Sequence, residues 1–219
     1  MTDNPARFFF EPRSIAVVGA SRTPGRAGHQ QLENLKSGFK GNIYAVNSGT
    51  DTIGNLPCYP TVASIPAEID LAIVLVPALH IPDVVRSCVE AEVPAVLIPA
   101  SGFAEASDEG RVRQQQLLDT VRGTRTRLWG PNNGGLLNLS NNLLASFIEF
   151  PVTRKGGISI VSQTGIYALA VFRQLMQVPG YGISKVATIG NACDINEADV
   201  IEFFAEDPDT RIIALHLEG

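Results

Sequence analysis

Short apolar runs recur along the whole chain, each bounded by small or polar residues. The runs are rich in β-branched residues and contain few polar ones, which is typical of strands that are buried on both faces of a parallel sheet. They predict strands at Ile15–Val18, Ile43–Val46, Leu71–Val76, Ala95–Ile98, Arg127–Trp129, Ile158–Val161, Ser184–Ile189 and Ile212–Leu217.

Many of the stretches between these runs have the periodicity of helices. One of them, Ile166–Gln177, is apolar almost all round, so we expect it to be deeply buried. Because strands and helices alternate, the pattern predicts an α/β architecture with doubly wound parallel sheets. The predicted helices are Gln30–Lys36, Pro82–Ala91, Asp108–Arg122, Ile166–Gln177 and Glu197–Ala205.

This alternation is interrupted between Gly130 and Gly157, a stretch rich in Asn, Gly and Pro. We interpret it as a structured crossing segment, with a domain boundary near residue 150 and Phe150-Pro151 as the hinge. Residues 1–150, including the crossing segment from about residue 130, would form the first domain, and residues 151–219 the second. A second domain of only about three strands would be thin, so we expect it to be incomplete.

The first predicted strand leads into a loop that is typical of nucleotide-binding units. Gly19 ends the strand, a small polar loop follows, and a helix begins after it, so backbone N–H groups can approach a phosphate. The glycines at 19, 25 and 28 do not fit G-x-G-x-x-G, and Asn47 stands where an NAD site needs an acidic residue. An NAD-dependent oxidoreductase is therefore disfavoured. A phosphate-bearing ligand and a tight turn without any ligand remain open.

A second candidate anion site precedes the apolar helix. Hydroxyls and a glycine in Ser162-Gln163-Thr164-Gly165 stand where the helix dipole and free N–H groups favour a phosphate. The alternative is a simple helix cap by Ser162 or Thr164. Other small and polar residues also follow predicted strands, so one extended ligand could contact several loops at this edge.

Composition and charge argue against several classes of protein, namely nucleic-acid-binding, metal-binding and membrane proteins. The chain has 219 residues, of which 45% are hydrophobic, and a net charge of −5 without a basic run, which argues against a nucleic-acid partner. Its three cysteines are far apart, which indicates a reducing compartment and gives no spacing for a metal site. No apolar stretch is long enough for a membrane span or a signal peptide, so we expect a cytoplasmic protein without membrane contact.

An ordered set of motifs resembles the NDP-forming (ADP-forming) acyl-CoA synthetases, relatives of the succinyl-CoA ligase α subunit. The likeness covers nearly the whole chain and is more specific than any single motif. The motifs are Phe9-Phe10-Glu11-Pro12-Arg13-Ser14, Ile43-Tyr44-Ala45-Val46-Asn47, Asp70-Leu71-Ala72-Ile73-Val74, Ser101-Gly102-Phe103-Ala104-Glu105, Gly130-Pro131-Asn132, Ser162-Gln163-Thr164-Gly165, Gly190-Asn191-Ala192-Cys193-Asp194, Asp207-Pro208-Asp209-Thr210 and Glu218-Gly219.

The resemblance implies a Rossmann-like CoA-binding domain followed by a partial, flavodoxin-like parallel α/β domain. It implies a ligase that makes an acyl-CoA from a small carboxylic acid, CoA and ATP, with a histidine that carries the phosphoryl group. Ser162, Thr164 and Gly165 would hold the transferring phosphate, and Glu218 would be the carboxylate that steadies the phosphohistidine. The residues expected at CoA are Gly19, Ser21, Arg22, Thr23, Pro24, Gly25, Asn47, Val76, Pro77, Ala100, Ser101, Gly102 and Asn132.

Three departures from the family pattern leave a second function possible for this chain. The family's nucleophilic histidine lies beyond residue 219, and His29, His80 and His216 do not have its context. Asn133 replaces a frequent cysteine. No lysine follows the second strand, although Arg22 or Arg26 could compensate. A non-catalytic CoA-sensing or partner-binding module is therefore the alternative.

Part of the reaction would have to take place outside this sequence. We find no ATP-grasp segment and no Walker lysine motif. ATP or ADP with Mg would therefore bind to a separate ATP-grasp domain or subunit. The thin second domain also favours an oligomer.

Overall fold

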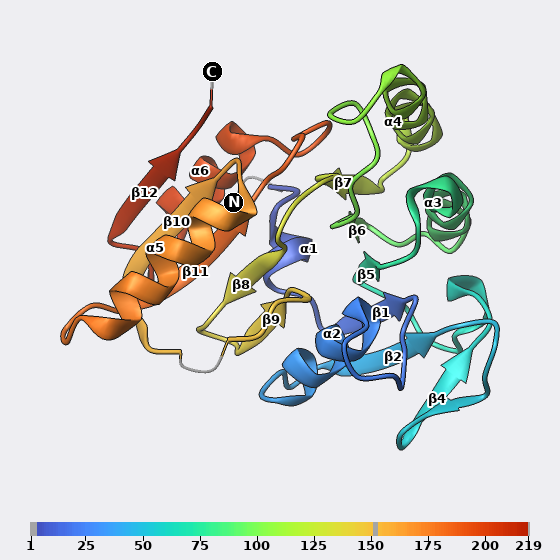
Figure 1. The fold of residues 1–219 in the computed structure, drawn as a ribbon, viewed down its shortest axis with the longest axis horizontal. Helices are drawn as coiled ribbons and strands as arrows, with labels where there is room; N and C mark the ends of the chain where they lie inside the picture. The colour runs from blue at the N-terminus through green and yellow to red at the C-terminus, as the bar shows by residue number, and fades with distance from the viewer. Residues whose placement is uncertain (1–3, 151–152, 219) are drawn as a thin grey trace.

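The computed structural model describes residues 4–150 and 153–218, which form two sheets with helices between and outside them (Figure 1). The predicted hinge residue Pro151 lies outside the described residues.

The first sheet has the Rossmann-like arrangement that the sequence predicts. Its strand order is β3-β4-β2-β1-β5-β6-β7, and all neighbours are parallel except the β3–β4 hairpin. The fully buried β1 pairs with β2 on one side and β5 on the other. The strands are β1 (Ser14–Val18), β2 (Asn42–Val46), β3 (Thr52–Ile53), β4 (Leu56–Tyr59), β5 (Leu71–Val74), β6 (Ala95–Leu97) and β7 (Arg127–Trp129).

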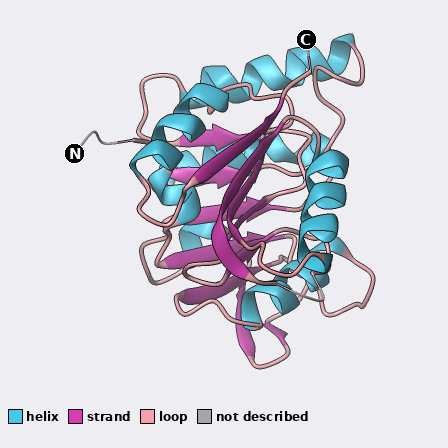
Figure 2. Cartoon of the chain, turned by 90° about the vertical axis from the view of Figure 1, so that its left-hand side faces the viewer, coloured by secondary structure: helices cyan, strands magenta, loops and turns pink. Residues whose placement is uncertain are grey.

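The second sheet is mixed, with the strand order β12-β10-β11-β8-β9. Strand β10 is parallel to its neighbours β11 and β12, whereas β8 and β9 form an antiparallel hairpin beside β11. In Figure 2 these strands lie in front of the first sheet and cross its strands steeply. The strands are β8 (Leu136–Asn138), β9 (Leu143–Ala145), β10 (Lys155–Ser162), β11 (Ile183–Thr188) and β12 (Ile212–His216).

The helices form three layers around these sheets. Helices α3 and α4 cover the outer face of the first sheet, α1, α2 and α6 lie between the sheets, and α5 covers the outer face of the second sheet (Figure 1). Two short 3-10 helices are at Val62–Ser64 and Ala78–His80. The α-helices are α1 (Arg7–Phe10), α2 (Ala27–Lys36), α3 (Ile81–Glu90), α4 (Asp108–Val121), α5 (Gly165–Gln177) and α6 (Glu197–Glu206).

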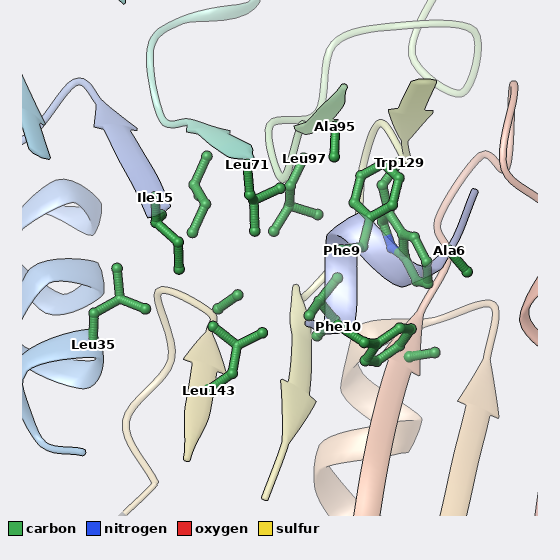
Figure 3. Close-up of a cluster of buried hydrophobic side chains, with 14 of the residues drawn as sticks. Ala6, Phe9, Phe10, Ile15, Leu35, Leu71, Ala95, Leu97, Trp129 and Leu143 are labelled. Carbon is green, nitrogen blue, oxygen red and sulfur yellow. The ribbon is translucent and has the colours of Figure 1, made fainter. Parts of the chain in front are cut away.

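The largest core joins the two sheets. Phe9 and Phe10 of α1 pack against Trp129 at the end of β7, with ring centroids 5.2 and 5.6 Å from that of the indole (Figure 3). Phe10 also stacks on Phe203 of α6. The indole N–H of Trp129 donates a hydrogen bond to the carbonyl of Thr188 in β11. The short α1 therefore holds the two sheets together.

The crossing segment supplies strands to the second sheet. Residues 136–145 form β8 and β9, so the chain passes from one sheet to the other between Trp129 and Leu136. The proposed domain boundary near residue 150 stays a prediction.

Helix α5 is not deeply buried, contrary to the prediction. Only Ala168, Phe172 and Met176 are buried, whereas 82% of Ile166 and 44% of Tyr167 are exposed. The helix packs one face on the second sheet and has no second layer above it among the described residues.

No helix in the described part of the chain has the length and apolar character needed to cross a bilayer.

Candidate functional site

A groove of about 700 Å³ lies at the carboxyl ends of the first sheet's strands. This is the edge at which open α/β sheets bind ligands. The groove is lined by Gly19, Ala20, Ser21, Thr23, Arg26, Ala27, Gly28, Asn47, Leu75, Val76, Pro77, Pro99, Ala100, Ser101 and Phe147.

Two glycines allow the first loop and helix α2 to come close together. Gly19 has φ +84°, and a Cβ there would lie 2.7 Å from the carbonyl oxygen of Leu75. A Cβ at Gly28 would lie 2.0 Å from the carbonyl oxygen of Gly19. The start of α2 therefore rests directly on the loop, and its first N–H groups face the groove edge.

The same loop is held from the second strand. The Asn47 side chain donates to the carbonyl of Ala20 at 2.8 Å and accepts from the N–H of Gly49 at 2.8 Å. The hydroxyl of Ser21 accepts from the N–H of Thr23 at 3.1 Å. The amide of Asn47 thus shapes the groove by fixing the loop.

Most of the residues expected at CoA lie together at this groove. Arg22, Pro24 and Gly25 belong to the same exposed loop but do not line the groove, and Gly102 sits one residue beyond its wall. Asn132 lies in a second cavity instead. The expected residues that line the groove are Gly19, Ser21, Thr23, Asn47, Val76, Pro77, Ala100 and Ser101.

The second cavity, of about 520 Å³, continues from the first. The two share Pro99, Ser101 and Phe147 in their walls, so an extended ligand could reach from one into the other. The further lining residues are Glu105, Asn132, Asn133, Gly134, Ile148, Gln163, Thr164, Gly165, Ile166, Leu169, Gly190, Asn191 and Glu218.

Helix α5 begins at this second cavity. Thr164 is its N-cap but makes no side-chain capping bond, and the buried hydroxyl of Ser162 donates to the carbonyl of Thr164 at 2.8 Å. The simple capping alternative therefore does not describe these hydroxyls. The hydroxyl of Thr164 and the N–H groups of the first turn remain as donors to an anion at the helix start.

Glu218 reaches the same cavity from the end of β12. Its backbone N–H donates to the side-chain oxygen of Gln163 at 2.9 Å, which places it beside the loop before α5. Of the residues predicted to hold phosphate, Thr164 and Gly165 line this cavity together with Glu218, the predicted carboxylate. Ser162 does not line it and contacts it only through its hydrogen bond to the carbonyl of Thr164. None of His29, His80 and His216 lines either cavity.

A polar bridge connects the two sheets at the rim of this cavity. Asn191 donates to the carboxylate of Glu105 at 2.5 Å and to the side chain of Gln114 at 2.9 Å. The other oxygen of Glu105 accepts from the N–H groups of Gly102 and Phe103 at 2.6 and 3.1 Å. Burial alone would raise the pKa of Glu105, but these hydrogen bonds outweigh it and lower the pKa.

Asn133, which departs from the family pattern, has a structural role. Its side chain donates to the carbonyl of Ile98 and accepts from the N–H of Gly135, each at 2.8 Å. Asn133 is buried. Its amide therefore fixes the passage between the sheets at the second cavity, which Asn133 lines.

Some lining residues escaped the sequence reasoning. The glycine pattern of the first loop includes Gly28, whose close approach to the Gly19 carbonyl brings the start of α2 to the groove. Phe147 and Ile148 come from the crossing segment, where no periodicity pointed to a site. They reach the cavities because α2 holds them: Asn34 donates to the carbonyls of Ser146 and Ile148, both at 2.7 Å.

Comparison with protein families identifies both halves of the chain. Residues 13–137 match the CoA binding domain, and residues 155–219 match the succinyl-CoA ligase like flavodoxin domain. The first match covers more than half of the chain.

Individual relatives agree with these matches. The chain is 38% identical to an ADP-forming acetate–CoA ligase II of Archaeoglobus fulgidus, over 97% of this chain and 32% of that protein. It is 34% identical to the α subunit of an ADP-forming acetate–CoA ligase II of Pyrococcus furiosus, over 97% of this chain and 46% of that subunit. The chain thus spans only a third to a half of these relatives.

A solved structure shares the arrangement of both domains. It is the dinucleotide forming acetyl-coenzyme A synthetase 1 of Ca. Korarchaeum cryptofilum in complex with phosphate and ADP, with TM-score 0.91 and 34% identity over 98% of this chain and 45% of that chain. The resemblance seen in the sequence motifs is therefore confirmed. The chain belongs to the NDP-forming acyl-CoA synthetase family, with a CoA binding domain followed by a succinyl-CoA ligase like flavodoxin domain.

Proposed function

We propose that the chain is the CoA-binding and acyl-transfer portion of an acid–CoA ligase that forms ADP. The observation that carries this proposal is the pair of adjoining cavities with shared walls at Pro99, Ser101 and Phe147. The first groove suits the nucleotide end and arm of CoA, and the second receives the thiol, the acid and a phosphate.

The residues of the first groove fit an elongated phosphorylated ligand. The groove brings backbone close to the ligand at Gly19 and Gly28, and Arg26 is the one cation among its described lining residues. A guanidinium at the start of α2 suits a pyrophosphate that also accepts from backbone N–H groups. Arg26 thus takes the place of the family's lysine.

In the proposed reaction the CoA sulfur attacks the carbonyl carbon of an acyl phosphate. A C–S bond forms, the bond from the acyl carbon to the phosphate oxygen breaks, and inorganic phosphate leaves with the proton that the thiol gives up. Thr164 and the N–H groups at the start of α5 would hold that phosphate, which their position at the cavity supports. Glu218 would orient a phosphohistidine supplied from outside residues 1–219.

The ATP-dependent half of the reaction belongs to another domain or subunit. ATP or ADP with Mg would bind to an ATP-grasp part, and the relatives that are α subunits support a partner chain.

Three free cysteines, Cys58, Cys88 and Cys193, fit a cytoplasmic location.

The test is ligand-dependent melting of the protein, titrated separately with CoA, dephospho-CoA and NAD. A ligand that binds only the folded state stabilises it by about 2.7 kcal/mol at one hundred times its Kd. We expect CoA to raise the melting temperature and NAD to have no effect. No rise at millimolar CoA would contradict the proposal and favour a partner-binding module.

Substitution of Arg26 locates the effect. We expect Arg26→Gln to weaken CoA binding about tenfold, since one charge-assisted contact to phosphate is lost. The matched control is Arg86→Gln, because Arg86 is exposed on α3, pairs with Asp83 at 2.9 Å and lies outside the groove. Equal losses in both variants would place CoA elsewhere.

A further inference from the structure

A third cavity, of about 660 Å³, lies at the edge of the second sheet where β10, β11 and β12 begin. It shares no described lining residue with the groove or the second cavity. Strand β10 runs from Lys155 at this cavity to Ser162 beside the second one, a length of about 23 Å. The lining residues are Ser140, Arg154, Lys155, Gly156, Gly157, Ile158, Gly180, Tyr181, Gly182, Ile183, Pro208, Asp209, Arg211 and Ile212.

This third cavity is cationic, although the whole chain has a net charge of −5. Arg154, Lys155 and Arg211 line it, and Asp209 supplies the one carboxylate among its described lining residues. The hydroxyl of Ser140 already donates to that carboxylate at 2.6 Å. Because a hollow surface concentrates the field of the charges that line it, the cavity attracts an anion.

Arg211 has its charged group free for such an anion. Within the described part of the chain, its guanidinium has neither an ion-pair nor a hydrogen-bond partner. Its backbone N–H donates to the carbonyl of Gly157 at 2.8 Å, and a Cβ at Gly157 would lie 2.9 Å from its Cδ. The glycine therefore leaves room for the arginine stem against β10. A guanidinium with open N–H groups is a preferred partner of phosphate oxygens.

Backbone carbonyls hold the two other cations in place. Arg154 donates to three carbonyls at and after the end of α5, at 3.0 to 3.1 Å. Lys155 donates to the carbonyl of Ser140 at 3.3 Å. Neither side chain pairs with a carboxylate among the described residues, so both positive charges remain for a ligand.

Aromatic and apolar side chains stand beside these cations. Tyr181 lines the cavity and is 49% exposed, and Ile212 lines it and is 58% exposed. An aromatic ring that is half open to water suits a flat ring system, which can stack on it. The carboxylate of Asp209 offers acceptor oxygens, which the hydroxyl groups of a sugar need.

We infer that this cavity binds a nucleoside di- or triphosphate, at a site separate from the two cavities of the proposed ligase site. The phosphates lie between Arg211 and Lys155, the base stacks on Tyr181, and Asp209 accepts from ribose hydroxyls. A terminal phosphate carries nearly two negative charges at neutral pH, which the three cations balance. NAD has no terminal phosphate and therefore does not meet this requirement.

Equilibrium dialysis of the chain with ADP tests the inference, with excess CoA present so that the first groove is not open to the nucleotide. We expect one ADP per chain with a Kd of about 0.1 mM. Excess NAD should not displace it. No binding at millimolar ADP, or displacement of ADP by NAD, would overturn the inference.

Three arginine variants locate the nucleotide. We expect Arg211→Gln to weaken ADP binding about tenfold, because the free guanidinium is lost. The matched control is Arg173→Gln, since Arg173 is an exposed residue of α5 that lines none of the three cavities. Arg26→Gln, in the first groove, should also leave ADP binding unchanged. A loss in Arg26→Gln and none in Arg211→Gln would place ADP in the first groove and overturn the inference.

A further variant separates a nucleotide from a simple phosphate anion. We expect Tyr181→Ala to weaken ADP binding about tenfold through the lost stacking, and to leave the binding of inorganic pyrophosphate unchanged. Because Tyr181 and Arg211 are both exposed, their variants should unfold at the temperature of the wild type, which thermal unfolding checks. Equal ADP affinity in Tyr181→Ala and the wild type would contradict recognition of the base.

Discussion

At the scale of single residues, the second domain contains a buried ion pair. The side chains of Lys185 and Asp207 are only 1% and 8% exposed, and Nζ lies 2.6 Å from Oδ2. Thr210 donates a further hydrogen bond to the Asp207 carboxylate. The pair ties the connection between α6 and β12 to β11.

This pair should make stability depend on acid pH. Burial would raise the pKa of Asp207, but the hydrogen bonds from Lys185 and Thr210 lower it below its ordinary value. The stabilisation is therefore complete above the unfolded-state pKa of about 3.9, and it is lost as the pH falls through the folded-state pKa.

We expect Asp207→Asn to lower the free energy of unfolding by about 3–5 kcal/mol at pH 7, because it leaves Lys185 buried without a counter-ion. Its acid-induced loss of stability should be smaller than that of the wild type. Denaturant unfolding at pH 7, 5 and 3 measures both effects. The control is Asp119→Asn, which breaks an exposed pair with Arg122. A change below 1 kcal/mol for Asp207→Asn would contradict this account.

The sequence pattern predicted the strand that contains Lys185 but not the ion pair that it forms. The apolar run around it predicted the strand Ser184–Ile189, and the structure has β11 at Ile183–Thr188. Asp207 comes 22 positions later, after a helix, so no local periodicity connects the two. Pairings of this kind depend on topology that the sequence pattern leaves open.

At the scale of elements, two helices start in direct contact with backbone. A Cβ at Gly28 in α2 would lie 2.0 Å from the carbonyl oxygen of Gly19, and one at Gly110 in α4 would lie 2.0 Å from that of Phe103. Both helices therefore depend on a glycine in the first turn for their position against a loop at the groove edge.

We expect Gly28→Ala to destabilise the protein by about 2 kcal/mol, although alanine favours helix by about 1 kcal/mol over glycine. The contact is with backbone, which no rotamer change relieves. Glu33→Ala, at an exposed position of the same helix, should change stability by less than about 0.5 kcal/mol. Thermal unfolding measures the stability of both variants relative to the wild type. A Gly28→Ala variant more stable than the wild type would contradict this prediction, because the loop could then move away from the added methyl group.

Elements differed in how well the sequence predicted them. All eight predicted strands and all five predicted helices have counterparts, because buried runs and helical periods are strong signals. The structure also contains β3, β4, β8, β9 and α1, which were not predicted. Strands β8 and β9 lie in the stretch rich in Asn and Gly, and the four residues of α1 are too few to show a helical period. The predicted burial of α5 was wrong because an apolar composition cannot say which face the rest of the structure covers.

At the scale of the whole molecule, the two sheets share one core. Phe9, Phe10 and Trp129 join side chains of both sheets, as Figure 3 shows. Arg127 of β7 binds the carboxylate of Asp194, beyond β11, at 2.7 Å. The sequence predicted two domains and a site at the carboxyl ends of the strands, and both stay predictions. The contacts between the two sheets could not be predicted, because they join residues far apart in the chain.

This shared core predicts that the two sheets unfold together. We expect calorimetry of residues 1–219 to give one transition, with the calorimetric and van't Hoff enthalpies equal. Phe10→Ala should cost about 3–5 kcal/mol through the cavity that it leaves, and should lower the single transition by about 10 °C. Tyr181→Ala, at a half-exposed aromatic outside this core, should change it little. Two separate transitions in the wild type would mean that the core between the sheets adds less than the cores within them, and CoA would then raise only the transition of the first sheet.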